Sequence, residues 1–161
     1  MNLNLFFTPT DILLPAHADM RRWSVIACDQ FTADAGYWQA VQDTVGDAPS
    51  TLRLMLPEFY LGKCDEAAAT REIQQTMRRY LDDGVFRTVP HGLVLVQRTL
   101  PGGAVRCGIV GALDLEAYDY APDSVTPIRA TEGTVASRLP ARVRIRAAAA
   151  LCSERIGISR I

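Results

Sequence analysis

The stretch of residues 65–83 constrains the fold most strongly, because it has the pattern of a long amphipathic helix. Asp65 stands where an N-cap residue would accept a backbone N–H, and Gly84 stands just beyond the far end. The apolar side chains between them recur at helical spacing and share one stripe: Ala69, Ile73, Met77, Tyr80 and Leu81. We interpret this helix as scaffold, with its charged face in solvent.

Shorter patterns on either side alternate between helix and strand. Residues 35–45 predict a second helix, with Asp34 as its cap and Gly46 at its end. Four apolar or alternating runs predict strands: residues 23–28, 51–56, 93–99 and 104–111. The last two are joined by Leu-Pro-Gly-Gly, which is typical of a hairpin. Together the patterns predict an α+β fold with a mixed sheet and flanking helices.

The composition is that of a globular chain. With 161 residues and 48% hydrophobic content, the chain can bury one sizeable core. It lacks an apolar run of eighteen residues and a basic signal-peptide flank, so we expect a cytoplasmic protein that does not associate with membranes. The four cysteines and two histidines show no metal-ligand spacing, which argues against a zinc site and a disulfide framework.

Charge is distributed unevenly along the chain. Residues 1–128 carry 10 basic and 16 acidic side chains, whereas residues 129–161 carry 7 arginines and two glutamates. Five of those arginines fall within residues 128–146. The basic end is too short and too poor in aromatic residues for a nucleic-acid surface, so we expect no nucleic-acid partner.

Residues 128–146 are therefore the main candidate site. Arginine forks match the geometry of phosphate or carboxylate, and the turn at residues 131–134 could open a helix whose backbone N–H groups point at an anion. The same residues also fit a structural ion-pair cluster with an ordinary helix cap. Both interpretations stay open. The alternation of Val143 and Ile145 with arginines predicts that this stretch ends in a strand with one arginine face.

Three acidic residues elsewhere are candidates for chemistry. Asp29 follows the predicted strand 23–28, where polar side chains often line a ligand crevice, although it could equally cap the next turn. Asp114 and Glu116 would share one face of a predicted strand at residues 111–120 and could bind Mg²⁺ together with nucleotide phosphates. A solvent-facing edge explains the same pair.

Four blocks of the sequence carry a family resemblance. They are W-S-V-I-A-C-D-Q-F-T at residues 23–32, G-D-A-P-S-T-L-R-L-M-L-P at residues 46–57, G-A-L-D-L-E-A-Y-D-Y at residues 111–120, and residues 128–146. In this order they resemble the bacterial and archaeal family known as domain of unknown function 1015. The resemblance runs from about Ile12 to Arg146, and we expect residues 1–146 to be the N-terminal portion of a family domain. Residues 147–161 resemble nothing in the family, and we expect them to be an atypical tail from a frameshift or truncation.

The resemblance implies a ParB/sulfiredoxin-like fold, incomplete in this chain, and a nucleotide-dependent activity. Related superfamily members include free-serine kinases and CTP-binding partition proteins. By that analogy the chain would be a phosphotransferase on a small, serine-like hydroxy metabolite, using ATP or ADP with Mg²⁺. Glu132 and Asp29 would be catalytic, and six residues would hold the nucleotide: Arg129, Thr131, Gly133, Thr134, Arg138 and Arg142.

The alternatives are a nucleotide- or phosphate-binding regulatory or scaffold module without catalysis, and an inactive gene fragment. We also expect a homodimer or an aggregation-prone chain, because a truncated sheet exposes its edge.

Overall fold

The computed structural model describes residues 6–129 and 136–151, and it confirms the α+β fold class. The chain divides into two compact units. We call the first the strand unit (Met1–Leu14, Thr88–Thr134 and Arg155–Ile161) and the second the helical unit (Pro15–Arg87 and Val135–Glu154). Each unit is described here by itself.

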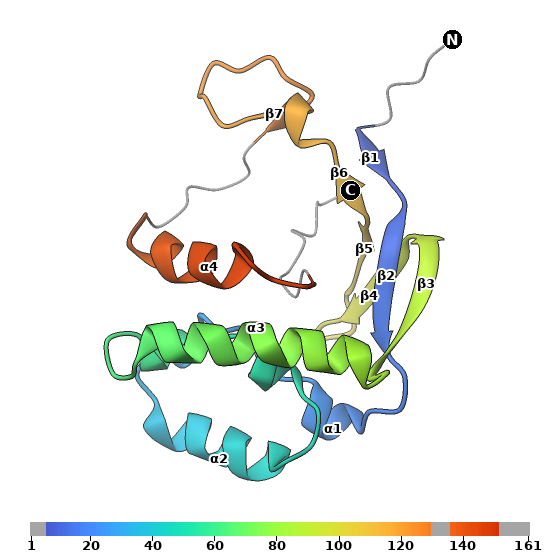
Figure 1. Ribbon diagram of the computed structural model, residues 1–161. Coiled ribbons are helices and arrows are strands. Elements are labelled where there is room, and N and C mark those ends of the chain that lie inside the picture. The colour runs from blue at the N-terminus through green and yellow to red at the C-terminus, as the bar shows by residue number, and fades with distance from the viewer. Residues whose placement is uncertain (1–5, 130–135, 152–161) are drawn as a thin grey trace. The chain divides into compact units, whose positions relative to one another are not determined.

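The helical unit contains every α-helix that the structure describes (Figure 1). None of the described helices is long and apolar enough to cross a bilayer. In chain order the helices, with 3-10 helices marked η, are α1 (Met20–Trp23), α2 (Ala35–Val45), η1 (Thr51–Leu54), η2 (Glu58–Tyr60), α3 (Glu66–Asp82), η4 (Ala136–Arg138) and α4 (Leu139–Arg146).

The two helices predicted from the sequence are confirmed, and so are their caps. The Asp65 carboxylate accepts hydrogen bonds from the backbone N–H groups of Ala67 and Ala68, at 3.0 and 2.9 Å, which fixes the start of α3. The Asp34 carboxylate does the same for α2 through the N–H of Tyr37, at 2.9 Å. Gly46 ends α2 with a positive φ of 53°, a conformation that costs glycine little.

The core of the helical unit forms around the apolar stripe of α3. Ile73, Met77 and Tyr80 pack with Trp23 and Leu54, and all five side chains are buried. The Tyr80 hydroxyl also accepts a hydrogen bond from the buried N–H of Ser50, at 3.0 Å. The predicted scaffold role of α3 is consistent with this packing, because the helix supplies most of the core.

Residues 23–28 and 51–56 do not form strands, so both of these predictions were wrong. Trp23 ends α1, and residues 51–54 form η1. In these segments a side-chain hydroxyl makes hydrogen bonds to backbone groups that would otherwise pair with a neighbouring strand. The Thr51 hydroxyl donates to the carbonyl of Trp23 at 2.8 Å and accepts from the N–H of Val25 at 3.2 Å. Side-chain hydrogen bonds of this kind compete with regular ladders.

The predicted arginine-faced strand at the end of residues 128–146 was also wrong, because this stretch forms α4. Pro140 lies in the first turn, where a missing N–H costs little. Ile145 packs against the core, whereas Val143 is 57% exposed. In a strand these two side chains would face the same side, so their different burial reflects the helical geometry.

The strands pair two by two. Their bounds are β1 (Phe7–Thr8), β2 (Thr10–Pro15), β3 (Phe86–Gly92), β4 (Val94–Thr99), β5 (Val105–Val110), β6 (Ala112–Leu113), β7 (Tyr118–Asp119) and β8 (Ile128–Arg129). Among the described residues, β1 pairs with β6, β2 with β3, β4 with β5, and β7 with β8. The β1–β6 and β4–β5 pairs are antiparallel and the β7–β8 pair is parallel.

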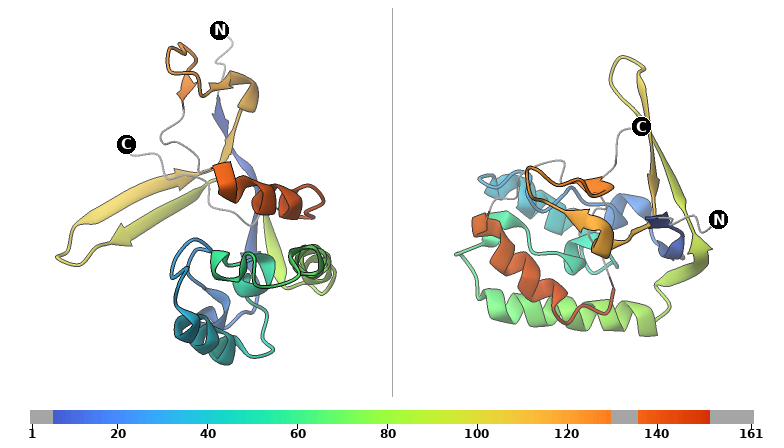
Figure 2. Two further views of the ribbon diagram at one scale, coloured as in Figure 1. Left: turned by 90° about the vertical axis from the view of Figure 1, so that its left-hand side faces the viewer. Right: turned by 90° about the horizontal axis from the view of Figure 1, so that it is seen from above.

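The predicted hairpin is confirmed as β4 and β5, which form a long two-stranded ribbon (Figure 2). Its register runs from Val94 opposite Val110 to Thr99 opposite Val105. Gly102 and Gly103 have φ angles of 96° and 86° in the connecting turn, where residues with a Cβ would be strained.

Residues 111–120 form only short pieces of strand, so the extended strand predicted there was wrong. Between β6 and β7 lies the 3-10 helix η3 (Leu115–Ala117). The Asp114 carboxylate caps it by accepting from the N–H of Glu116, at 3.0 Å. This local cap competes with the extended backbone that the alternating pattern predicted.

Candidate functional site

Three charged side chains from distant parts of the sequence meet in the helical unit. Nη2 of Arg142, on α4, lies 3.0 Å from Oε1 of Glu58 and 3.8 Å from Oδ2 of Asp29. We call these three residues the Arg142 cluster. The arginine and the aspartate were both predicted as site residues, and the fold brings them together across 113 positions of the sequence.

Burial differs within the Arg142 cluster. The Glu58 side chain is only 9% exposed, whereas those of Asp29 and Arg142 are each 34% exposed. A carboxylate buried to this extent requires a close positive partner. The hydrogen bond from Arg142 to Glu58 supplies that partner, and Asp29 remains the carboxylate that solvent reaches more easily.

Local backbone structure positions both carboxylates. Glu58 is the first residue of η2, directly after Pro57. Its backbone N–H donates to the carbonyl of Cys28, at 2.8 Å, which holds the start of η2 against the segment that carries Asp29. Asp29 also accepts a hydrogen bond from the Gln30 side chain at 3.1 Å. The spacing between the two acidic groups is therefore set by the backbone as well as by the arginine.

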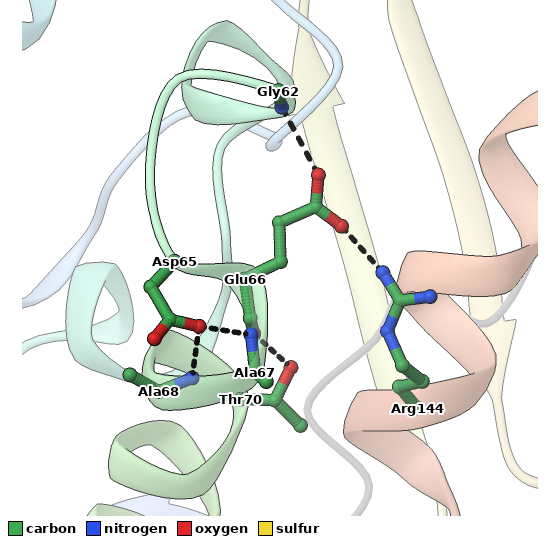
Figure 3. A network of polar contacts seen from close by, with 7 residues as sticks. All are labelled: Gly62, Asp65, Glu66, Ala67, Ala68, Thr70 and Arg144. Atoms are coloured by element: carbon green, nitrogen blue, oxygen red, sulfur yellow. Dashed lines mark hydrogen bonds and ion pairs between the residues drawn. The ribbon is translucent and has the colours of Figure 1, made fainter.

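A second ion pair fixes the helix that carries Arg142. Figure 3 shows the Glu66 carboxylate between the backbone N–H of Gly62, at 3.0 Å, and Nη2 of Arg144. Gln74 adds hydrogen bonds to the carbonyls of Arg144 and Ile145, at 2.9 and 3.1 Å. These bonds satisfy carbonyl groups near the end of α4, which otherwise lack helical partners. They attach α4 to α3, beside which it lies.

Several predicted site residues cannot be placed in this site. Thr131, Glu132, Gly133 and Thr134 lie outside the described residues. The backbone of Arg138 belongs to η4, but its side chain lies outside the description.

Other predicted residues belong to the strand unit. Arg129 lies in β8 and is exposed. Asp114 and Glu116 do not share a strand face, because Asp114 caps η3 and Glu116 lies within it. No group of three or more potential metal ligands occurs among the described residues. The magnesium role of this pair stays a prediction.

Sequence reasoning missed Glu58. The one local signal is its place after Pro57 at the start of a short helix, where acidic residues are common. Its partner Arg142 is 84 positions away, so the pairing could be found only from the fold.

A helical unit that contains the partly buried Arg142 cluster, together with a unit of two-stranded β-pairs, defines an α+β protein with a polar site. Residues 9–158 match the family model described as "Protein of unknown function (DUF1015)". The chain belongs to this family. No match was found among curated proteins or among solved structures.

Proposed function

We propose that the chain binds a nucleotide through its arginines and that the Arg142 cluster forms the acceptor side of a phosphotransferase site. The acceptor would be a small hydroxy metabolite, serine-like by analogy with the superfamily that the sequence resembles. One observation carries the proposal: Asp29 and Arg142, predicted separately, lie 3.8 Å apart with Asp29 still reachable from solvent.

The charges of the Arg142 cluster favour binding of the acceptor there and binding of the phosphates elsewhere. Two carboxylates and one guanidinium sum to −1, so the cluster by itself does not attract a polyphosphate. It suits a hydroxyl group or a cationic group better. The phosphates would be held by Arg138, another arginine of the basic segment in the helical unit, whereas Arg129 belongs to the strand unit and its phosphate role stays a prediction.

In this proposal Asp29 acts as the general base. It accepts the proton of the acceptor hydroxyl, whose oxygen attacks the terminal phosphorus while the bond to the bridging oxygen breaks. The products are a phosphate monoester and a nucleoside diphosphate. Arg142 orients the base, and Glu58 holds Arg142 in place. Mg²⁺ would offset charge on the phosphates; no group of three or more potential metal ligands occurs among the described residues, and no step above depends on the ion.

The alternative is a binding module without catalysis. It is favoured by the contacts of Arg142 itself, since a guanidinium held by two carboxylates is also typical of a structural ion pair. Under this alternative the chain binds nucleotide but transfers nothing.

Thermal shift measurements with ATP, ADP and CTP test the binding step. Ligand at a hundredfold over its dissociation constant should stabilise the chain by about 2.7 kcal/mol. Arg138→Ala should remove the shift, and Arg71→Ala, on the solvated face of α3, should not. If none of the nucleotides shifts the melting temperature, the proposal fails and the arginines are structural.

Phosphorus NMR of the full chain mixed with serine and a nucleoside triphosphate tests the transfer step. Phosphoserine formation that Asp29→Asn abolishes, with the nucleotide-induced melting shift retained, supports the phosphotransferase. A melting shift without any phosphate monoester supports the binding module instead. Transfer that Asp29→Asn leaves unchanged contradicts the role of Asp29.

A further inference from the structure

A separate cavity of about 400 Å³ lies in the helical unit. It is lined by residues of α2, η1, η2 and α3 and the segments between them, and none of the Arg142 cluster contributes to it. Its volume falls in the range of small-molecule sites. The lining includes apolar side chains from the edge of the core: Val45, Leu52, Met55, Leu56 and Ile73.

The hydroxyls of Thr76 and Tyr60 line this cavity, and within the described residues neither donates a hydrogen bond. The Thr76 side chain is buried, with the residue only 3% exposed, and its oxygen accepts from Nη2 of Arg79 at 3.2 Å. Within the described residues its proton has no acceptor. By contrast, Thr70, six residues earlier on α3, donates to the carbonyl of Glu66 at 2.7 Å. A buried donor without an acceptor is uncommon in folded proteins.

Tyr60, which is half-buried, also lines the cavity. Its phenol oxygen accepts from Nε2 of Gln42 at 2.8 Å, and its proton likewise has no acceptor in the part of the chain that the structure describes. Thr76 and Tyr60 therefore both offer O–H donors to whatever occupies the cavity.

The charged residues of the lining indicate the charge of the ligand that the cavity would bind. Arg53, Glu72 and Arg79 contribute two positive charges and one negative charge. Arg53 donates to the carbonyls of Gly46 and Ala48, near the end of α2, so its donors already serve the fold. Arg79 is exposed, and among the described residues no carboxylate lies within ion-pair distance of it. A lining charge of +1 fits a monoanion better than a nucleotide.

We propose that this cavity binds a small carboxylic acid with an apolar body. The carboxylate accepts from Arg79, Thr76 and Tyr60, and the hydrocarbon part packs on the apolar lining. Charge-assisted hydrogen bonds from a guanidinium and two hydroxyls give the head group its specificity. This site is independent of the proposed phosphotransfer, so either proposal can fail without the other.

Isothermal titration of the full chain with hexanoate, hexan-1-ol and inorganic phosphate tests the ligand class. Hexanoate should bind saturably with one-to-one stoichiometry. Hexan-1-ol should bind at least about tenfold more weakly, because it cannot engage Arg79 as an anion. The proposal is overturned if hexanoate does not bind, or if the chain binds hexan-1-ol or inorganic phosphate as tightly as it binds hexanoate.

Variants on α3 test the position of the site. Arg79→Gln and the nearly isosteric Thr76→Val should each weaken hexanoate binding about tenfold. Arg71→Gln, on the same helix but outside the cavity lining, should bind like the parent chain. Circular dichroism confirms that each variant folds, and Tyr60→Phe replaces any variant that does not. Unchanged affinity in Arg79→Gln would place hexanoate elsewhere and overturn the proposal.

Discussion

The helical unit and the strand unit differ in where their apolar side chains lie. Every buried hydrophobic side chain among the described residues belongs to the helical unit. In the strand unit, large apolar side chains are exposed instead, including Leu95 at 69% and Ile109 at 41%, which face each other across the β4–β5 ribbon. An isolated two-stranded ribbon is marginally stable in water. We infer from this difference that the helical unit supplies the stabilising core of the chain. The same unit contains the Arg142 cluster.

The largest effect is expected from the core of the helical unit. Met77→Ala should lower the free energy of unfolding by about 2–5 kcal/mol, because Met77 is 1% exposed and its truncation leaves a cavity. Urea unfolding followed by tryptophan fluorescence measures this. Both tryptophans of the chain, Trp23 and Trp38, are buried in this unit.

Leu95→Ala is the matched change in the strand unit. It should alter the same free energy by less than about 0.5 kcal/mol, because Leu95 is mostly exposed. Equal losses in the two variants would show that the units share one core, against the comparison drawn above.

The next effect concerns the Arg142 cluster. Arg142→Met should destabilise the helical unit by about 1–3 kcal/mol, because it leaves the Glu58 carboxylate buried without its arginine. The partial exposure of Arg142 keeps the effect below that of a fully buried pair.

Adding Glu58→Gln to Arg142→Met should recover part of that loss, since the uncompensated charge is then removed. Arg71→Met is the solvent-exposed control and should be nearly neutral. A double variant that is no more stable than Arg142→Met alone would show that the ion pair does not explain the burial of Glu58.

A smaller effect concerns association through the strand unit. The exposed apolar side chains of β4 and β5 should make the chain dimeric or aggregation-prone, as the sequence also predicted. The double variant Leu95→Thr and Ile109→Thr should reduce the mass measured by light scattering and leave the urea midpoint nearly unchanged. A monodisperse monomer before any substitution would contradict this.

The smallest effect is the titration of Asp119, in β7. A hydrogen bond from the backbone N–H of Ala121, with a lesser one from the Ser124 hydroxyl, lowers the pKa of Asp119 below its ordinary value of 3.8. A lowered folded pKa contributes stability above the unfolded value, and that contribution is lost as the pH falls through the folded pKa. NMR titration of the side chain should place its midpoint below 3.8. A midpoint at or above this value would contradict the turn geometry.

The sequence predicted the elements whose signals are local and redundant. For α2 and α3 the caps and the apolar periodicity agree, and for the β4–β5 hairpin the alternation agrees with a glycine turn. Short apolar runs were misread, because five or six residues do not separate a strand from a helical turn or irregular backbone. Two local hydrogen bonds decided against predicted strands: the Asp114 carboxylate accepts from the N–H of Glu116, and the Thr51 hydroxyl donates to the carbonyl of Trp23.

The candidate site was predictable only in part. Asp29 and Arg142 could be selected by residue type, but the sequence did not predict that their side chains lie close together. Glu58 was missed, because its burial and its contact with Arg142 depend on how α4 docks against α3. That docking rests on Glu66 and Gln74, two polar residues of the helix that the sequence indicated only as scaffold.

Hydrogen exchange of the full chain, followed by mass spectrometry, tests the central claim most directly. If the helical unit carries the stabilising core, amides within α3 should exchange slowest, and those of β4 and β5 should exchange at least roughly tenfold faster through local opening. The α4 amides after the first turn should follow α3, because Gln74 and the Glu66–Arg144 pair hold the two helices together. Protection of β4 and β5 equal to that of α3 would contradict the account.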